Sequence, residues 1–162
     1  MAETEFSVAR ELNRILRERG LTVAVAEGST GGRIGERLAR YAGATAYFKG
    51  AVVTYDYPSR TAILGIPEAT LAAHGSVSEQ AACAMAASVR ERFGADFGLA
   101  STGVAGPSGT NVGLVWTAVA TPVATLARGS RLPRAPRQRL QGRFAMIALQ
   151  LLREAVRAYP AR

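Results

Sequence analysis

The segment AGATAYFKGAVVTYDYPSR, residues 42–60, holds side chains whose types and spacing could support covalent chemistry. Thr45 offers a hydroxyl, Tyr55 ends an apolar run, and Arg60 follows Asp56 by four residues. A hydroxyl becomes a useful nucleophile only when a neighbouring base removes its proton. A guanidinium group stays protonated in proteins, so Arg60 cannot supply that base.

Two other groups in the segment could act as the base. Lys49 is the single lysine among the 20 lysine and arginine residues of the chain. On a helical turn Lys49 would share a face with Thr45, whereas on a strand it would point to solvent. Asp56 is the other group, although its spacing from Arg60 also suits an ion pair between the two. The sequence leaves these alternatives open.

Two glycine-rich turns follow apolar runs, EGSTGG at 27–32 and STGVAGPSG at 101–109. Such turns let backbone amides approach an anion, and the first also opens a helix whose free amides favour a phosphate. Neither turn has a Walker ending or the GxGxxG fingerprint. Because ligands of open α/β sheets bind at the carboxyl ends of strands, we expect a nucleotide or phosphate there. The candidate binding residues are Glu27, Ser29, Thr30, Gly31, Thr102, Gly103 and Gly106.

The hydrophobic pattern predicts a single α/β domain over residues 1–162. Helices are expected at 4–19, 33–43, 76–93 and after Pro136, short helical turns after Pro58 and Pro67, and strands at 21–27, 48–56, 96–106, 112–122 and 123–132. The motif SVSE at 76–79 predicts a capping box with Ser76 as N-cap. This order favours a three-layer α/β/α fold around a mixed, mostly parallel sheet of about five strands, with the last two strands antiparallel.

Composition narrows the class of protein. No run approaches the ~20 apolar residues of a membrane span, and the amino terminus lacks the pattern of a secretory signal. The single cysteine, Cys83, forms no internal disulfide and is interpreted as a small core residue, which fits a cytoplasmic location. One cysteine and one histidine argue against a zinc site.

The net charge of +8 resides in the carboxyl-terminal region. From Arg128 onward there are nine arginines against one acid, Glu154, and nine minus one gives eight. A nucleic-acid surface would carry interleaved aromatic residues, and this segment has few. We therefore favour a solvated surface, with a nucleic-acid-binding module as the alternative.

Several motifs, taken together and in order, resemble the C-terminal domain of the competence/damage-inducible protein CinA, the nicotinamide mononucleotide deamidase family. EGSTGG at 27–32 resembles ESCTGG, so that Gly28 and Ser29 stand where the family has Ser-Cys. GATAYFKGAVVTYDYPSRTAILGI at 43–66 resembles GSSAYFxGGVVxYSNxxKxxLLGV. The segment HGSVSEQAACAMAASVRERFGADFGLASTGVAGPSG at 74–109 and VGLVWTAVATP at 112–122 also resemble the family's motifs.

The resemblance implies hydrolysis of the nicotinamide mononucleotide amide to nicotinic acid mononucleotide and ammonia. It implies a serine nucleophile, a lysine base and an assisting tyrosine, with no metal or cofactor, in a homodimer or higher homo-oligomer. Aligned on GSSAYF, Thr45 takes the nucleophile position, Tyr55 the tyrosine position and Arg60 the lysine position. Arg137 takes the place of an arginine before the last helix, as a phosphate or carboxylate clamp.

These substitutions leave two expectations of function. The first is an amidohydrolase of altered dyad, Thr45 and Arg60, whose activity is weak or lost unless Lys49 replaces the base. The second is a non-catalytic paralogue that still binds a pyridine nucleotide, or that partners an active copy.

Overall fold

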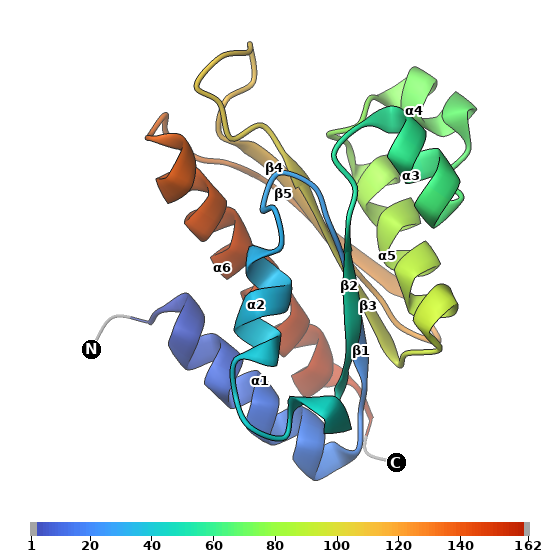
Figure 1. The fold of residues 1–162 in the computed structure, drawn as a ribbon, viewed down its shortest axis with the longest axis vertical. Helices are drawn as coiled ribbons and strands as arrows, with labels where there is room; N and C mark the ends of the chain where they lie inside the picture. Colours follow the sequence, from blue (N-terminus) through green and yellow to red (C-terminus); the bar gives the residue numbers. More distant parts are fainter. Residues whose placement is uncertain (1–2, 161–162) are drawn as a thin grey trace.

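The computed structural model describes residues 3–160 as three layers, with a sheet between two groups of helices (Figure 1). The helices are α1 Glu5–Arg19, α2 Arg33–Ala39, α3 Tyr57–Leu64, α4 Glu68–His74, α5 Glu79–Phe93 and α6 Arg137–Ala158, with a 3-10 turn at Ala44–Ala46. The strands are β1 Val23–Glu27, β2 Phe48–Val53, β3 Phe97–Gly103, β4 Leu114–Ala120 and β5 Thr125–Arg131. The predicted α/β/α class and order of elements are confirmed.

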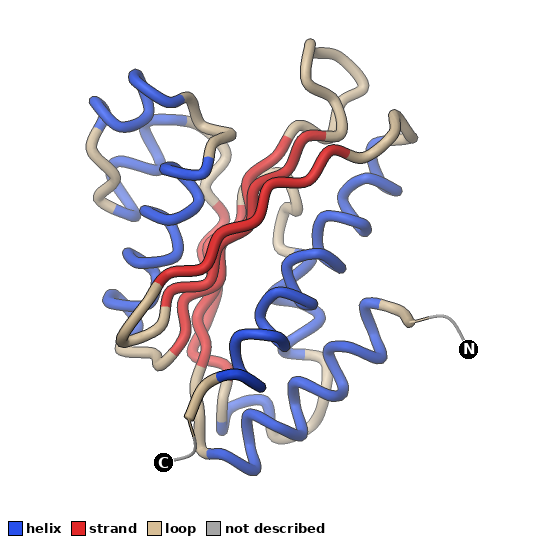
Figure 2. The backbone as a smooth tube through the Cα atoms, turned by 180° about the vertical axis from the view of Figure 1, so that it is seen from behind, coloured by secondary structure: helices blue, strands red, loops and turns tan. Residues whose placement is uncertain are grey.

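The sheet has the order β2-β1-β3-β4-β5 and twists strongly between the helical layers (Figure 2). Strands β1, β2 and β3 are parallel, while β4 runs antiparallel to both β3 and β5. Every residue of β1 is buried because helices cover both faces of the central strands. The carboxyl ends of β1, β2 and β3 therefore meet at one end of the molecule, where both glycine-rich turns begin.

Two apolar clusters hold the layers together. One packs α1, α2 and α6 on one face of the sheet, and the other packs α3, α4 and α5 on the opposite face. Helix α5 approaches β3 closely because both contribute small residues there, among them Ala86 and Gly98. Cys83 packs against this second cluster, and burial raises the pKa of its thiol. Within residues 3–160 no helix combines the length and the apolar character that crossing a membrane requires.

The start of α5 differs from the prediction. Ser78, not Ser76, is the N-cap, and its hydroxyl accepts a hydrogen bond from the amide of Ala81 at 3.1 Å. The predicted capping box is wrong by two residues because both positions carry a serine, and only the fold selects between them. Ser76 thus lies before the helix, and its carbonyl group is free for other partners.

We expect Gly98→Ala to lower the free energy of unfolding by about 3 kcal/mol, a severe case of overpacking. The added Cβ would lie 2.0 Å from the carbonyl oxygen of Ala86. Gly142→Ala is the matched control, because nothing lies within 4 Å of its Cβ. Replacing that helix-interior glycine should raise stability by roughly 0.5–1 kcal/mol. Urea denaturation measures both, and a Gly98→Ala variant as stable as the parent would contradict the close packing.

Candidate functional site

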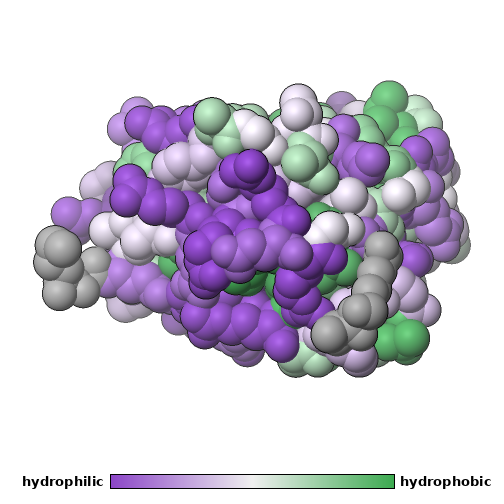
Figure 3. All heavy atoms as spheres, turned by 90° about the horizontal axis from the view of Figure 1, so that it is seen from below, coloured by the Kyte–Doolittle hydropathy of each residue, from purple (hydrophilic) through white to green (hydrophobic). Residues whose placement is uncertain are grey.

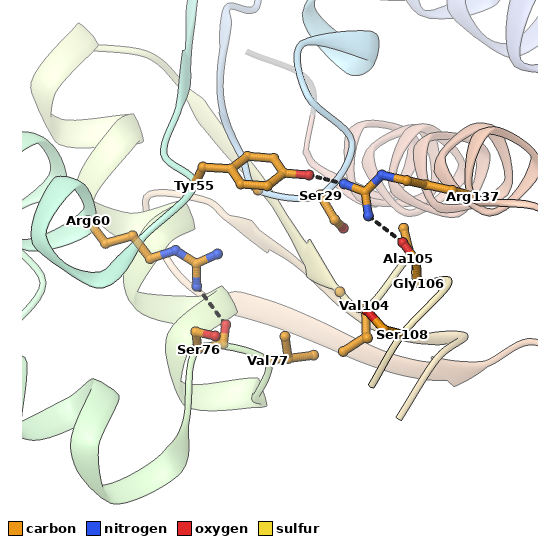
Figure 4. Close-up of a pocket in the computed structure, with 12 residues that line it drawn as sticks. Ser29, Tyr55, Arg60, Ser76, Val77, Val104, Ala105, Gly106, Ser108 and Arg137 are labelled. Atoms are coloured by element: carbon orange, nitrogen blue, oxygen red, sulfur yellow. Dashed lines mark hydrogen bonds between the residues drawn. The ribbon is translucent and has the colours of Figure 1, made fainter. Parts of the chain in front are cut away.

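A cavity of about 320 Å³ lies at the carboxyl ends of the parallel strands (Figure 4). Its walls come from the loops after β1, β2 and β3, from helix α3, from the loop between α4 and α5, and from the start of α6. The lining residues are Gly28, Ser29, Tyr55, Arg60, Ser76, Val77, Gly103, Val104, Ala105, Gly106, Ser108 and Arg137. Its volume is at the lower end of the ~300–1,000 Å³ typical of small-molecule sites.

Arg60 is the dominant group of the cavity. Its side chain is 4 % exposed, and its guanidinium donates to the carbonyl of Ser76 at 2.6 Å and to the hydroxyl of Thr102 at 3.1 Å. Both partners are neutral, and no ion pair within residues 3–160 involves Arg60. Burial lowers the pKa of Arg60, although a guanidinium remains charged at neutral pH. The cavity thus holds a buried cation without a counter-ion.

Asp56, the expected ion-pair partner of Arg60, serves another purpose. Its carboxylate accepts a hydrogen bond from the amide of Ser59 at 2.8 Å and caps helix α3. The hydrogen bonds from Ser59, through its side chain and then its backbone, lower the pKa of Asp56. The prediction of an Asp56–Arg60 pair is therefore wrong, since the cap turns the carboxylate toward the helix start.

Arg137 provides a second cation on the opposite side of the cavity (Figure 4). It is the first residue of α6, and it donates to the carbonyl of Gly106 at 2.6 Å and to the hydroxyl of Tyr55. Tyr55 is 59 % exposed and follows β2, so this contact joins the β2 loop to α6 across the site. The structure thus brings Tyr55, Arg60 and Arg137 to one cavity, together with Ser29, Gly103 and Gly106.

Glu27 has a different role from the one expected. Its fully buried carboxylate accepts hydrogen bonds from the amides of Gly32 and Ile34 at 3.1 Å and of Gly35 at 2.8 Å. These are the helix-opening amides that the sequence assigned to a phosphate, so the first turn has no such subsite. Thr30 and Gly31 face a separate hollow beside α2 and do not line the cavity.

Thr102 contacts Arg60 and does not itself line the cavity. Its hydroxyl is fully buried, accepts from the guanidinium, and donates to the carbonyl of Ser76 at 2.7 Å. The residue therefore fixes the arginine in place. Its predicted role as a binding residue becomes an indirect one.

Thr45 and Lys49 lie away from the cavity. Thr45 is in the 3-10 turn before β2, and the neighbouring Tyr47 accepts a hydrogen bond from the amide of Val23, at the amino end of β1. Strand β2 separates this turn from Tyr55, a span of about 20 Å at ~3.3 Å per residue. That distant end of the molecule is covered mainly by hydrophilic side chains (Figure 3). Within one subunit, the structure therefore does not bring Thr45 or Lys49 together with Arg60, and the Thr45–Arg60 dyad stays a prediction.

The sequence did not predict some of the residues that line the cavity. Ser76 and Val77 belong to the HGSVS segment, which was part of the resemblance but was interpreted only as a helix start. Gly28 matters because a Cβ at this position would lie 2.8 Å from Nη2 of Arg60. The glycine that replaces the serine of ESCTGG was therefore a usable signal, because it makes room for the arginine.

The polar groups of the cavity suit the binding of an anion. Among residues 3–160, no carboxylate, imidazole or amine lines the cavity. The hydroxyl of Ser29 is buried and has no hydrogen-bond partner, so it can bond to a ligand. Within residues 3–160 no three histidine, cysteine or acidic side chains gather as metal ligands would. The arrangement suits an anion held by two guanidinium groups.

Comparison with known proteins agrees with the motifs. A family model described as the CinA C-terminal domain matches residues 5–156. A CinA-like protein of Chloroherpeton thalassium is 39% identical over 97% of this chain, and one of Frankia casuarinae is 42% identical over 90%. The chain spans 39% and 34% of the length of these two curated relatives.

Solved structures of similar length share the fold. A competence/damage-inducible protein of Agrobacterium tumefaciens is 32% identical, with a TM-score of 0.90 over 97% of this chain and 99% of that one. The competence damage-inducible protein A of Klebsiella pneumoniae is 26% identical, with a TM-score of 0.93 over 98% and 100% of the two chains.

Glu27→Gln should destabilise the protein by about 2 kcal/mol, because an amide NH₂ would face backbone N–H donors. Glu18→Gln in α1 is the matched control, since its side chain is 57% exposed and pairs with the exposed Arg14. An exposed pair of this kind contributes ~0–1 kcal/mol. Thermal unfolding of both variants tests the difference, and equal losses would refute a structural role for Glu27.

Arg60→Met should raise the stability of the ligand-free protein by about 1 kcal/mol, which is ~2–4 °C in Tm. The substitution removes a buried charge, and Thr102 still donates to the carbonyl of Ser76. Arg139→Gln, which removes an exposed charge near the start of α6, should leave Tm nearly unchanged. A clear fall in the Tm of Arg60→Met would mean that the charge of Arg60 is already compensated.

Proposed function

Because the chain belongs to the CinA C-terminal domain family, we propose that its cavity binds a pyridine nucleotide such as nicotinamide mononucleotide. We further propose that hydrolysis of the amide is very slow or absent, so that the domain acts as a binding protein. The observation that carries this proposal is the buried, uncompensated guanidinium of Arg60 in a cavity without a general base.

The charges of the cavity support an anionic ligand. Bringing a cation out of water costs several kcal/mol, and an anion that enters the site offsets this cost. Guanidinium groups bind phosphate and carboxylate with paired hydrogen bonds. Arg60 and Arg137 both face the cavity, and no acidic side chain of residues 3–160 lines it. A nucleotide phosphate is the kind of group that such a site attracts.

The weakness of catalysis follows from the missing base. Amide hydrolysis needs an activated hydroxyl or water, and activation needs a group that accepts a proton. Ser29 supplies a hydroxyl at the cavity, but the other polar groups of the lining are guanidinium groups, a phenol, serine hydroxyls and backbone. Glu27 is the last residue of β1, two positions before Ser29, yet its carboxylate already accepts three backbone hydrogen bonds. The ligand can be held without being cleaved.

The arginine-rich carboxyl-terminal region gives little support to nucleic-acid binding. Arg128 pairs with Glu154, while Arg153 and Arg157 pair with Glu11 of α1. These charges stabilise contacts between elements of the fold. The small-molecule site is therefore the better supported reading.

At about 100 times its Kd, nicotinamide mononucleotide should stabilise the protein by ~2.7 kcal/mol and raise Tm by several degrees. Ammonia release should stay at the rate of the protein-free control. Arg137→Gln should reduce the shift in Tm, and Arg139→Gln should preserve it, because Arg139 lies outside the cavity. No shift at millimolar nucleotide would count against binding, and steady ammonia release would count against a non-catalytic role.

A further inference from the structure

We infer that the cavity selects a ligand with two anionic ends, a phosphate near Arg137 and a carboxylate at Arg60. This inference rests on the proposed function. The preferred ligand is nicotinic acid mononucleotide, the acid form of the nucleotide, and the amide form binds less tightly. The chain would thus recognise the product of an amide hydrolysis that another protein carries out.

The two cations lie on facing sides of one cavity. Arg60 extends from α3, and Arg137 extends from the first turn of α6 (Figure 4). Neither forms an ion pair with a carboxylate of residues 3–160. A ligand with a single charge would compensate one of them only. A ligand charged at both ends compensates both.

The donors of Arg60 are only partly used. A guanidinium carries five N–H groups. One of them bonds to Ser76 and one to Thr102, so five minus two leaves three. One of these three is on Nε, which is buried and has no hydrogen-bond partner among residues 3–160. Because Arg60 lines the cavity, we infer that its unused donors bond to the two oxygens of a carboxylate.

An amide fits this environment less well. Its oxygen accepts hydrogen bonds, but its NH₂ group is a donor and would meet the donors of Arg60. A carboxylate of the same shape offers two acceptors and the compensating charge. Discrimination between two ligands is a difference of affinities, and a donor placed against a donor lowers the affinity of the wrong one.

Gly28 leaves the space that the guanidinium of Arg60 occupies. A Cβ at residue 28 would lie 2.8 Å from Nη2, and the carbonyl oxygen of Ser101 lies 3.4 Å from the same point. The guanidinium therefore rests over the backbone of Gly28, in a space that a side chain would take. Its hydrogen bonds to the hydroxyl of Thr102 and the carbonyl of Ser76 fix its position.

The difference in exposure between Arg60 and Arg137 indicates which end of the ligand each of them binds. Arg60 is 4 % exposed, whereas Arg137 is only partly buried. A phosphate carries more charge than a carboxylate and loses more hydration on burial. The phosphate therefore fits the more open position at Arg137, and the carboxylate fits the buried one at Arg60.

Isothermal titration of the whole chain with nicotinic acid mononucleotide and with nicotinamide mononucleotide tests the inference. We expect the acid to bind at least about tenfold more tightly, as for one charge-assisted hydrogen-bonded pair. Arg60→Met should bring the ratio of the two affinities near one. Arg137→Gln should weaken both ligands by similar factors, and Arg139→Gln should weaken neither.

Each failure has its own signature. Equal affinities in the parent protein would overturn the inference and leave the proposed nucleotide binding intact. If a folded Arg60→Met variant still binds the acid more tightly than the amide by the same factor, Arg60 does not discriminate between the two ligands. Should that variant not fold, Arg60→Lys keeps the charge without the fork, and an unreduced ratio there would overturn the carboxylate fork. Binding of neither nucleotide at millimolar concentration would refute the proposed function itself.

Discussion

The organisation of the site depends on one unfavourable condition, the burial of the Arg60 charge among neutral partners. Its nearest acid in sequence, Asp56, is occupied by the start of α3, and its hydrogen bonds go to a carbonyl and a hydroxyl. Proteins keep such a charge where function requires it, at the expense of stability. The surrounding α/β core is well packed and extensive, and it supplies the stability that the site lacks.

The parallel strands of the sheet place the buried Arg60 in the wall of a cavity. Strands β1, β2 and β3 end together, so their loops converge on the same space. The buried carboxylate of Glu27 organises the first loop from within, by occupying the amides at the start of α2. The contact between Tyr55 and Arg137 joins the second loop to α6. A cavity held by such internal contacts is organised before a ligand arrives, which reduces the entropic cost of binding.

The sequence predicted the parts of this protein that depend on periodicity. Apolar runs located the strands, and the start of α6 after Pro136 followed from the spacing of its apolar residues. Tyr55, Arg60 and Arg137, which motif order assigned to a site, line one cavity. Thr45 lies away from this cavity because β2 carries the chain from one end of the sheet to the other, whereas a motif records only order along the chain. The hydrogen-bond partners of Glu27, Asp56 and Ser76 differ from those expected. A polar side chain has several backbone groups within reach, and the folded geometry determines which of them it bonds to.

The clash between a Cβ at residue 28 and the guanidinium of Arg60 has an evolutionary consequence. The motif ESCTGG has a serine at this position, and the related motif YSNxxK has a lysine at position 60. A serine at 28 would bring its Cβ within 2.8 Å of Nη2 of Arg60, so it requires the arginine side chain to shift or to be replaced. The effect of a substitution at 28 therefore depends on the residue at 60, and we expect the two positions to change together.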